Sequence, residues 1–229
     1  MKSFTISEVA ATIDHAVLKP NFTEADIEKH AKMCLARGVK SMCVRPCDVA
    51  LAAKCLAGSK VLVSVVIGFP HGHHRPEVKA LEAELAIRDG ARELDMVMNI
   101  GRFLAGDYDY VRRDIAAVVA VAKPKGMLVK VIQESGYLTL DQVAKACLIT
   151  EEAGADFVKT STGFGPGSAT PEIVAVMLKT VGGRLGVKPS GGIRDWKTAV
   201  GYLTQGANRL GVGSTEAVLD GGKAAEGAY

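Results

Sequence analysis

Short runs of Val, Ile and Leu alternate with amphipathic segments along the whole chain, and this alternation limits the folds open to it. Eight apolar runs of strand length occur, at residues 12–17, 41–44, 61–67, 93–99, 127–133, 157–161, 185–188 and 209–213. The segments between them carry apolar residues spaced three and four apart, as in Ile27, Ala31 and Cys34. This spacing is typical of helices that bury one face. The sequence therefore predicts repeated strand–helix units.

Residues that favour helix ends flank these segments. A threonine hydroxyl can accept a hydrogen bond from the first turn, and a glycine can end a helix in the left-handed conformation. The predicted starts carry Thr23, Thr139 and Thr170, and the predicted ends carry Gly38, Gly90, Gly154 and Gly206.

Eight such units in 229 residues, with no linker-like stretch, favour a single α/β domain over residues 1–229. The fold predicted for it is a (β/α)8 barrel of the TIM type. An open, doubly wound sheet is the competing fold, but open sheets more often contain fewer strands. Gly221, Gly222 and Gly227 favour a flexible C-terminal tail from about residue 221.

Composition argues against several classes of protein. The net charge is +3 without a basic block, so no nucleic-acid partner is expected. No apolar run approaches the about 20 residues that span a bilayer, and the first residues lack the apolar core of a signal peptide. We therefore expect a cytoplasmic protein without a membrane partner. The five cysteines form an odd set without a CxxC pair and are expected to be reduced thiols.

Two lysines, Lys159 and Lys188, end successive strand-like runs just before glycine-rich chain. An ammonium group is rarely buried unless it is paired or functional. Active sites of (β/α)8 barrels lie at the carboxyl ends of the strands. The two positions therefore predict chemistry done by an amine, and we expect Schiff-base formation.

Alternation along the strands predicts further charges inside the barrel, at Asp14, Asp95 and Lys130. A purely structural ion pair between Asp95 and Lys130 is the alternative for these two residues. A ring of mixed charge is costly to bury unless it is solvated or functional, which favours a site.

Adjacent parallel strands lie about 4.8 Å apart, so the ammonium groups of Lys159 and Lys188 can approach to about 6 Å. Like charges at that separation repel by about 2.8 kcal/mol at an effective dielectric of about 20. We therefore expect Lys188 to lower the pKa of Lys159 toward the neutral amine that attacks carbonyls. Asp95, within reach of either lysine, would exchange protons with the intermediates.

Five segments closely resemble deoxyribose-phosphate aldolase, a family of class I aldolases: DHAVLKP at 14–20, GFPHG at 68–72, ELDMVMNIG at 93–101, AGADFVKTSTGF at 153–164 and VKPSGGIR at 187–194. The likeness runs in order over nearly the whole chain. It implies reversible cleavage of 2-deoxy-D-ribose 5-phosphate to D-glyceraldehyde 3-phosphate and acetaldehyde. By this resemblance Lys159 forms the Schiff base, and Lys188 with Asp95 forms the proton-relay pair. No cofactor or metal is expected, because a protonated imine accepts the electrons that cleavage releases.

The phosphate of such a substrate needs an anion site on the same rim. Glycines after the sixth, seventh and eighth strands expose backbone N–H groups, and the helix starts that follow add positive dipole ends. An ordinary tight turn is the alternative for any one of them. The residues predicted to bind phosphate are Gly163, Gly191, Gly192, Gly213 and Ser214.

Several positions differ from the commoner pattern of that family. The loop with His71, His73 and His74 is either a metal site or an exposed loop, and the second is favoured because no carboxylate or cysteine stands at ligand spacing. Arg45 and Gln133 are also unusual, which leaves the substrate preference open.

Two further residues have open roles. Cys43 is expected to line the pocket, as the resemblance suggests, or to be a small buried hydrophobe. Tyr229 would either enter the site, as a C-terminal tyrosine does in some members of that family, or belong to a frayed tail.

Two other functions stay open at this point. One is a phosphosugar isomerase or lyase that uses Asp95 as its base, and the other is a non-catalytic phosphate-binding barrel. The expected partners are a small phosphorylated sugar and acetaldehyde, and a homodimer is one assembly that such a barrel can form.

Overall fold

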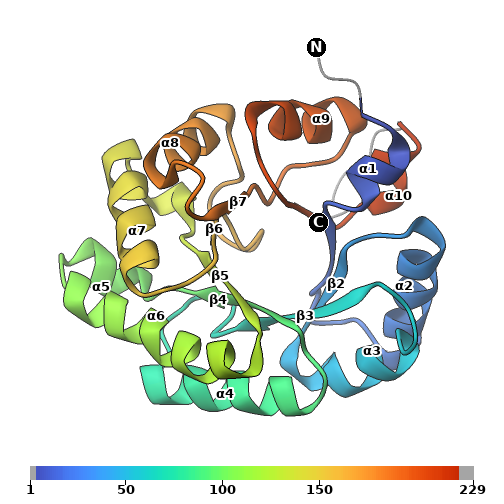
Figure 1. The fold of residues 1–229 in the computed structure, drawn as a ribbon, viewed down its shortest axis with the longest axis horizontal. Coiled ribbons are helices and arrows are strands. Elements are labelled where there is room, and N and C mark those ends of the chain that lie inside the picture. The colour runs from blue at the N-terminus through green and yellow to red at the C-terminus, as the bar shows by residue number, and fades with distance from the viewer. Residues whose placement is uncertain (1–3, 222–229) are drawn as a thin grey trace.

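Eight parallel strands form a nearly closed barrel with helices around it in a computed structural model that describes residues 4–221 (Figure 1). Each strand hydrogen-bonds to its neighbours in the order β7-β6-β5-β4-β3-β2-β1-β8. The strands are β1 Ile13–Val17, β2 Ser41–Val44, β3 Leu62–Ile67, β4 Glu93–Val97, β5 Leu128–Ile132, β6 Phe157–Lys159, β7 Gly186–Lys188 and β8 Leu210–Val212.

The ring closes between β7 and β8. Gly211 N–H donates to the carbonyl of Pro189 at 2.9 Å, and Asn208 N–H donates to that of Val187 at 3.0 Å. Ser190 and Gly211 form a parallel bridge beyond the end of β7. The predicted barrel is therefore confirmed, and the open doubly wound sheet is wrong.

The helices cover the outside of this ring, as Figure 1 shows. The α-helices are α1 Ile6–Ala10, α2 Glu24–Arg37, α3 Val49–Cys55, α4 Pro76–Arg88, α5 Ile100–Leu104, α6 Tyr108–Ala122, α7 Leu140–Glu152, α8 Pro171–Val181, α9 Trp196–Gln205 and α10 Thr215–Leu219. Short 3-10 turns lie at η1 Pro46–Asp48, η2 Lys123–Lys125 and η3 Ser135–Tyr137. None of these helices is long and apolar enough to cross a membrane.

The predicted helix ends are confirmed. Thr23 and Thr139 form capping boxes, and the hydroxyl of Thr170 accepts from the N–H of Ile173. Gly38 ends α2 in the left-handed conformation, at φ 62°. Glycine adopts this conformation without a steric penalty.

Strand β6 ends earlier than the sequence predicts. The apolar run extends to Ser161, but the strand stops at Lys159. Beyond this point the Thr160 hydroxyl bonds to both the N–H and the carbonyl of Ser190, at 2.9 and 3.0 Å. The backbone of Thr160 still bonds to those of Lys188 and Ser135, at 3.2 and 2.9 Å, so pairing continues for one residue before the chain leaves the barrel as a loop.

Alternation separates the two faces of every strand. Outward residues such as Val65, Met96 and Val131 belong to the large apolar core between strands and helices. A second, small apolar cluster of Leu18, Cys43 and Val66 lies apart from it. The predicted tail and Tyr229 lie outside the described residues, except for Gly221.

Candidate active site

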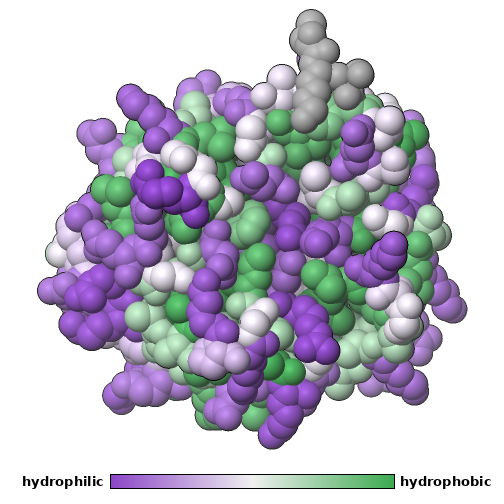
Figure 2. Space-filling model, in the orientation of Figure 1, coloured by the Kyte–Doolittle hydropathy of each residue, from purple (hydrophilic) through white to green (hydrophobic). Residues whose placement is uncertain are grey.

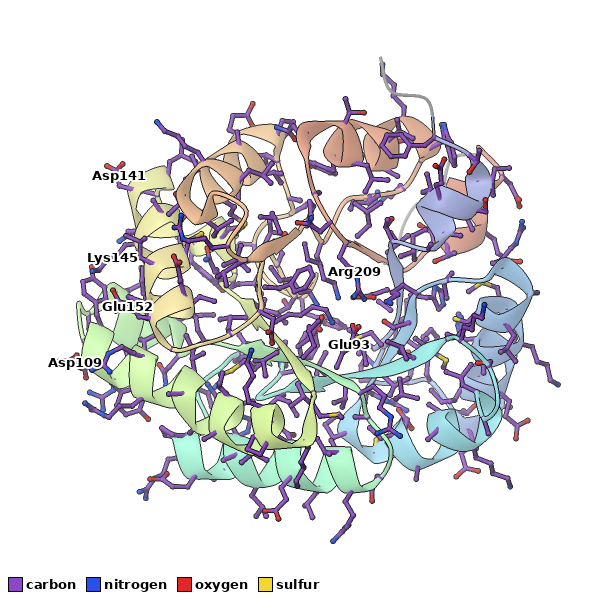
Figure 3. The ribbon with its side chains drawn as sticks, viewed as in Figure 1. Glu93, Asp109, Asp141, Lys145, Glu152 and Arg209 are labelled. Atoms are coloured by element: carbon purple, nitrogen blue, oxygen red, sulfur yellow. The ribbon has the colours of Figure 1, made fainter. Side chains whose placement is uncertain are left out.

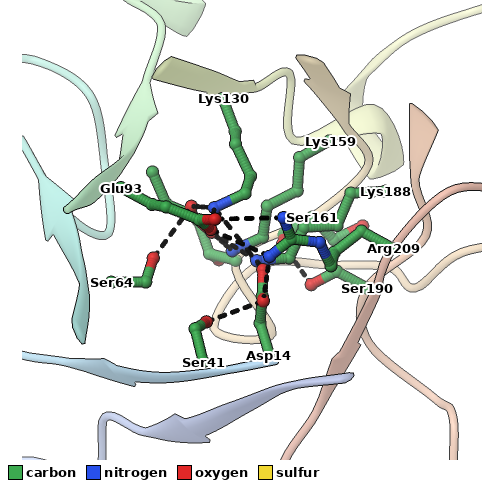
Figure 4. Close-up of polar contacts among 12 residues, drawn as sticks. Asp14, Ser41, Ser64, Glu93, Lys130, Lys159, Ser161, Lys188, Ser190 and Arg209 are labelled. Atoms are coloured by element: carbon green, nitrogen blue, oxygen red, sulfur yellow. Dashed lines mark hydrogen bonds and ion pairs between the residues drawn. The ribbon is translucent and has the colours of Figure 1, made fainter. Parts of the chain in front are cut away.

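Seven charged side chains meet inside the barrel and contact one another (Figure 4). Each is less than 10% exposed. They come from five strands and from the residue before β8: Asp14, Glu93, Asp95, Lys130, Lys159, Lys188 and Arg209. We call this set the charged ring. Figure 3 shows Glu93 and Arg209 near the middle of the barrel, whereas Asp109, Asp141, Lys145 and Glu152 lie at its edge.

Asp95 connects the predicted catalytic residues. Its Oδ2 accepts from Lys159 Nζ and from Lys188 Nζ, both at 2.7 Å. Its Oδ1 accepts from Lys130 Nζ at 2.8 Å and from the Ser64 hydroxyl at 3.3 Å. Burial alone would raise the pKa of Asp95, but the three ammonium groups outweigh it and hold that pKa well below the ordinary value. Asp95 is thus an ionised acceptor shared by three amines, and Lys159 and Lys188 bond to the same oxygen.

The strand register explains this meeting. Lys159 pairs with Lys188 across β6 and β7, and Asp95 pairs with Lys130 across β4 and β5. Because the side chains of alternate residues point to the same face, these pairs reach into one interior. The sequence predicted that Asp95 would lie within reach of either lysine, and it contacts both.

A second group of contacts supports the ring from the start of the strands. Arg209 donates to Asp14 at 2.6 Å and to both oxygens of Glu93 at 2.9 and 3.0 Å. Lys130 donates to Glu93 at 2.6 Å. The predicted pocket residues Asp14 and Lys130 are in the ring, and the ion pair between Asp95 and Lys130 exists as part of it.

Glu93 and Arg209 were not predicted from the sequence. Glu93 stands two residues before Asp95, so alternation alone could have placed it on the same face. Arg209 opens the predicted strand of residues 209–213 and precedes the observed β8, and no local pattern indicated a buried cation there. Burial lowers the pKa of Arg209, but Asp14 and Glu93 outweigh it and raise that pKa above the ordinary value.

The ring contains four cations and three carboxylates. One positive charge is left over when all seven groups are ionised, and the loss of one lysine proton would make the ring neutral. Lys130 lies within 4 Å of three carboxylates, Lys188 of two and Lys159 of Asp95 alone, counted over residues 4–221. Lys159 is therefore the amine that the ring holds least.

The sequence-based estimate of repulsion between the lysines left out a carboxylate placed between them. Asp95 bonds to both ammonium groups, and Asp14 bonds to Lys188 as well. Opposite charge so close offsets repulsion between like charges. The expectation that Lys188 lowers the pKa of Lys159 stays a prediction.

The small apolar cluster lies beside the ring. Val66 pairs in register with Asp95, and Cys43 packs with Val66 and Leu18. Burial and the charge of Asp95 raise the pKa of the Cys43 thiol, so the thiol is held protonated. Cys43 thus packs as a small apolar side chain close to the lysines.

The Ser161 hydroxyl is a free polar group near the ring. It is fully buried and has no hydrogen-bond partner within residues 4–221. Ser161 stands two residues after Lys159, so it belongs to the inward series of β6. A buried hydroxyl without a partner is costly, which makes Ser161 available to a bound substrate.

Two cavities open at the mouth of the barrel. One, of about 240 Å³, is lined by Lys19, His30, Phe164 and Gly213, among others. The other, of about 340 Å³, is lined mainly by apolar residues that include Phe69 and Phe164. The rings of Phe69 and Phe164 meet edge to face at 5.4 Å. Figure 2 shows hydrophilic residues gathered near the centre of one face of the molecule, with hydrophobic ones beside them.

The predicted phosphate-binding residues lie in the loops after β6, β7 and β8. Gly163, Gly191 and Gly192 have φ values of 86°, 82° and 75°, which favour glycine. Gly213 lines the first mouth cavity, and Ser214 directly precedes α10 without a side-chain hydrogen bond to its first turn. Lys19 adds a cation to that cavity that the sequence had not assigned to the site.

The unusual residues noted in the sequence serve mainly to hold loops. The Arg45 guanidinium donates to the carbonyls of Lys19, Pro20 and Phe22, at 2.9 to 3.1 Å. The Gln133 amide donates to Cys147 Sγ on α7.

The histidine loop is exposed, as favoured from the sequence. The rings of His71 and His73 stack with centroids 5.6 Å apart, and those of His73 and His74 lie 5.0 Å apart. The helix after the loop begins at Pro76.

The chain belongs to the DeoC/LacD family of aldolases, whose family model matches residues 8–212. A deoxyribose-phosphate aldolase of Thermococcus gammatolerans is 50% identical over 221 residues, which cover 96% of this chain and 98% of the relative. One of Clostridium perfringens is 49% identical, over 93% of this chain and 95% of the relative.

Solved structures agree with this assignment. A structure described as QR15, an aldolase, superposes with a TM-score of 0.88 at 40% identity, covering 93% of this chain and 95% of the other. A deoxyribose phosphate aldolase of Aeropyrum pernix, described as tetrameric, superposes with a TM-score of 0.86 at 32% identity, covering 94% of this chain and 91% of the other. The resemblance seen in the sequence is confirmed.

Proposed function

We propose that this protein is a class I aldolase that reversibly cleaves 2-deoxy-D-ribose 5-phosphate to D-glyceraldehyde 3-phosphate and acetaldehyde. Lys159 is the Schiff-base lysine, and Lys188 with Asp95 moves protons. One observation carries the proposal: Asp95 Oδ2 accepts hydrogen bonds from both Lys159 Nζ and Lys188 Nζ, each at 2.7 Å. One carboxylate between two amines can take a proton from one and return it to an intermediate.

The choice of Lys159 as the nucleophile rests on its contacts. Lys188 is held by Asp14 and Asp95, whereas Lys159 is held by Asp95 alone among the described residues. Loss of the Lys159 proton also removes the excess positive charge of the ring. A neutral amine is the form that adds to an aldehyde.

The reaction begins when Lys159 Nζ adds to the aldehyde carbon C1 of the open-chain sugar. The oxygen of the resulting carbinolamine takes up a proton and leaves as water, which gives a protonated imine. A base then removes the proton of the C3 hydroxyl, and the electrons of the C2–C3 bond move into the imine to form an enamine. C3 becomes the carbonyl carbon of glyceraldehyde 3-phosphate. Protonation of the enamine at C2 and hydrolysis of the imine release acetaldehyde and free Lys159.

The phosphate of the substrate would bind the rim formed by Gly163, Gly191, Gly192, Gly213 and Ser214. Backbone N–H groups in left-handed turns can converge on an anion without a charged side chain. Lys19 lines the same cavity as Gly213 and would add a positive charge there.

Borohydride reduction in the presence of acetaldehyde tests the proposal. A two-carbon reduced adduct is expected on the peptide that contains Lys159, measured by mass spectrometry. Lys179, an exposed lysine on α8, provides the matched control, because Lys179→Leu should leave the adduct intact and Lys159→Leu should abolish it. An enzyme that cleaves the sugar phosphate without an adduct would point to the isomerase or lyase alternative.

The homodimer also stays a proposal. The Aeropyrum pernix relative is described as tetrameric. Size-exclusion chromatography with light scattering would give the assembly state of this chain.

A further inference from the structure

Glu134 is buried just after β5 and has a backbone conformation that is rare for its residue type. It is 2% exposed and lies in the left-handed region, at φ 50° and ψ 58°. It is the only non-glycine residue with positive φ in residues 4–221. Backbone strain of this kind persists only where surrounding contacts enforce it, and it clusters at functional sites.

The Glu134 carboxylate holds the loop that follows β6. The N–H of Thr162 donates to both carboxylate oxygens, at 3.2 and 3.4 Å, and the Thr162 hydroxyl donates to Oε2. The same hydroxyl accepts the N–H of Phe164 at 3.0 Å. One carboxylate therefore fixes the chain on both sides of Gly163.

Close packing of the two loops adds to this hold. A Cβ atom on Gly165 would lie 2.8 Å from the Glu134 side chain, and one on Gly136 would lie 2.5 Å from the carbonyl oxygen of Pro166. Carbon atoms do not approach so closely without a shift. The loops after β5 and β6 are thus fitted to each other along their backbones.

The loop held in this way carries a residue of the proposed phosphate rim and a residue that lines the cavities beside it. Gly163 is one of the predicted phosphate-binding residues, and Phe164 lines both mouth cavities. Farther along the same loop, Ser168 packs against Gly191 and Gly192 of the next one. The positions of Gly163, Gly191 and Gly192 in the rim thus depend on the segment that Glu134 holds.

We propose that Glu134 is a positioning residue, which fixes the loop from Thr162 to Gly167 and so sets the preference of the enzyme for a phosphorylated substrate. The inference rests on the proposed aldolase function. When the carboxylate is removed, the loop samples more conformations, and phosphate binding must then also order the loop. No hydrogen bond or ion pair joins Glu134 to Lys159 within residues 4–221, and the Lys159 charge only partly opposes the rise in the pKa of Glu134 that burial causes.

The ratio of kcat/KM for 2-deoxyribose 5-phosphate to kcat/KM for unphosphorylated 2-deoxyribose is the quantity to measure. Glu134→Ala should lower this ratio by about tenfold, as expected for the loss of one charge-assisted contact, and mainly through KM of the phosphorylated sugar. Glu152→Ala removes an exposed glutamate of α7 and should leave the ratio unchanged.

Two substitutions at Thr162 separate positioning from simple loss of stability. Thr162→Val keeps the shape but removes the hydroxyl, and it should lower the ratio in the same direction as Glu134→Ala. Thr162→Ser keeps the hydroxyl and should stay near the wild-type ratio. The double variant Glu134→Ala/Thr162→Val should lower the ratio by less than the product of the two single effects, because the side chains act through one contact.

Suppose that the wild type forms the acetaldehyde adduct and prefers the phosphorylated sugar. An unchanged ratio of kcat/KM values in both Glu134→Ala and Thr162→Val would then overturn the role of Glu134 but not the aldolase function. A wild type without any adduct would overturn the proposed aldolase function and this inference with it.

Discussion

The inner and outer faces of the same eight strands differ in kind. Outward residues such as Ile67 and Val131 are fully buried in apolar contacts with the helices, whereas Lys130 and Asp95, from the same strands or their neighbours, are fully buried in ion pairs. Apolar burial stabilises a fold without needing exact partners, but a buried charge is tolerated only when it is paired. The outer face therefore maintains the barrel, and the inner face keeps reactive groups in fixed positions.

Lys159→Leu should cause the largest change, a loss of activity without a loss of stability. Removal of the proposed nucleophile should slow cleavage of 2-deoxyribose 5-phosphate by at least about 10⁴-fold. Because the remaining ring has equal numbers of cations and carboxylates, the free energy of unfolding in urea should hold at or above that of the wild type. A variant that cleaves the substrate faster than about one hundredth of the wild-type rate would show that the Schiff base forms elsewhere.

Lys130→Met tests the structural part of the inner face. The substitution removes the cation that contacts Glu93 at 2.6 Å and Asp95 at 2.8 Å, and it leaves both carboxylates buried. We expect a loss of about 3–5 kcal/mol in the free energy of unfolding. Urea denaturation measures it, with the exposed Lys179→Met as the control. A loss below about 1 kcal/mol would mean that Arg209, which still bonds to Glu93, and the two lysines on Asp95 compensate for the missing cation.

Lys188→Met separates proton transfer from imine formation. Without its second amine, Asp95 loses one partner in proton exchange, and cleavage should slow by about 10²-fold. The removal of a neighbouring cation should also shift the pH–rate profile to higher pH, while borohydride still traps acetaldehyde on Lys159. An unchanged rate together with an unchanged profile would exclude Lys188 from the relay.

His15 is a titratable residue on the outer face, and it makes the fold sensitive to acid. Burial, followed by the charge of His30, lowers the pKa of His15 from 6.5 to about 3. The unfolded chain therefore binds a proton at a pH where the folded one does not, so stability falls as the pH drops from 6.5 toward 3. Between pH 7 and pH 5 this loss should be about 2 kcal/mol. His15→Gln should reduce the dependence measured by denaturation at the two pH values, and an identical slope in the variant would assign it to other groups.

Ile67→Val should cause the smallest change, a loss of stability without a loss of activity. One buried methylene is removed from the outer core, which should cost about 0.5–1.5 kcal/mol of unfolding free energy. The exposed Leu81→Ala is the control and should cost less. A marked fall in kcat for Ile67→Val would show that the two faces of the strands are coupled.

The sequence by itself determined the barrel, the ends of its helices and the strands that carry Lys159, Lys188 and Asp95. These features follow from residues that are near one another in the chain. The spacing of apolar residues, the capping residues at helix ends and the alternation of side chains along a strand each involve only a few successive positions. The same alternation placed Asp14 and Lys130 inside.

Only the tertiary structure decided how these groups are paired. The bond from Arg209 to Glu93 spans 116 positions in the chain, and the one from Lys188 to Asp95 spans 93. Strand register and closure of the barrel also decide that Lys159 and Lys188 share one oxygen of Asp95, and that Glu134 bonds to Thr162. Such contacts are set by the geometry of distant strands and loops, to which no local pattern of residues corresponds.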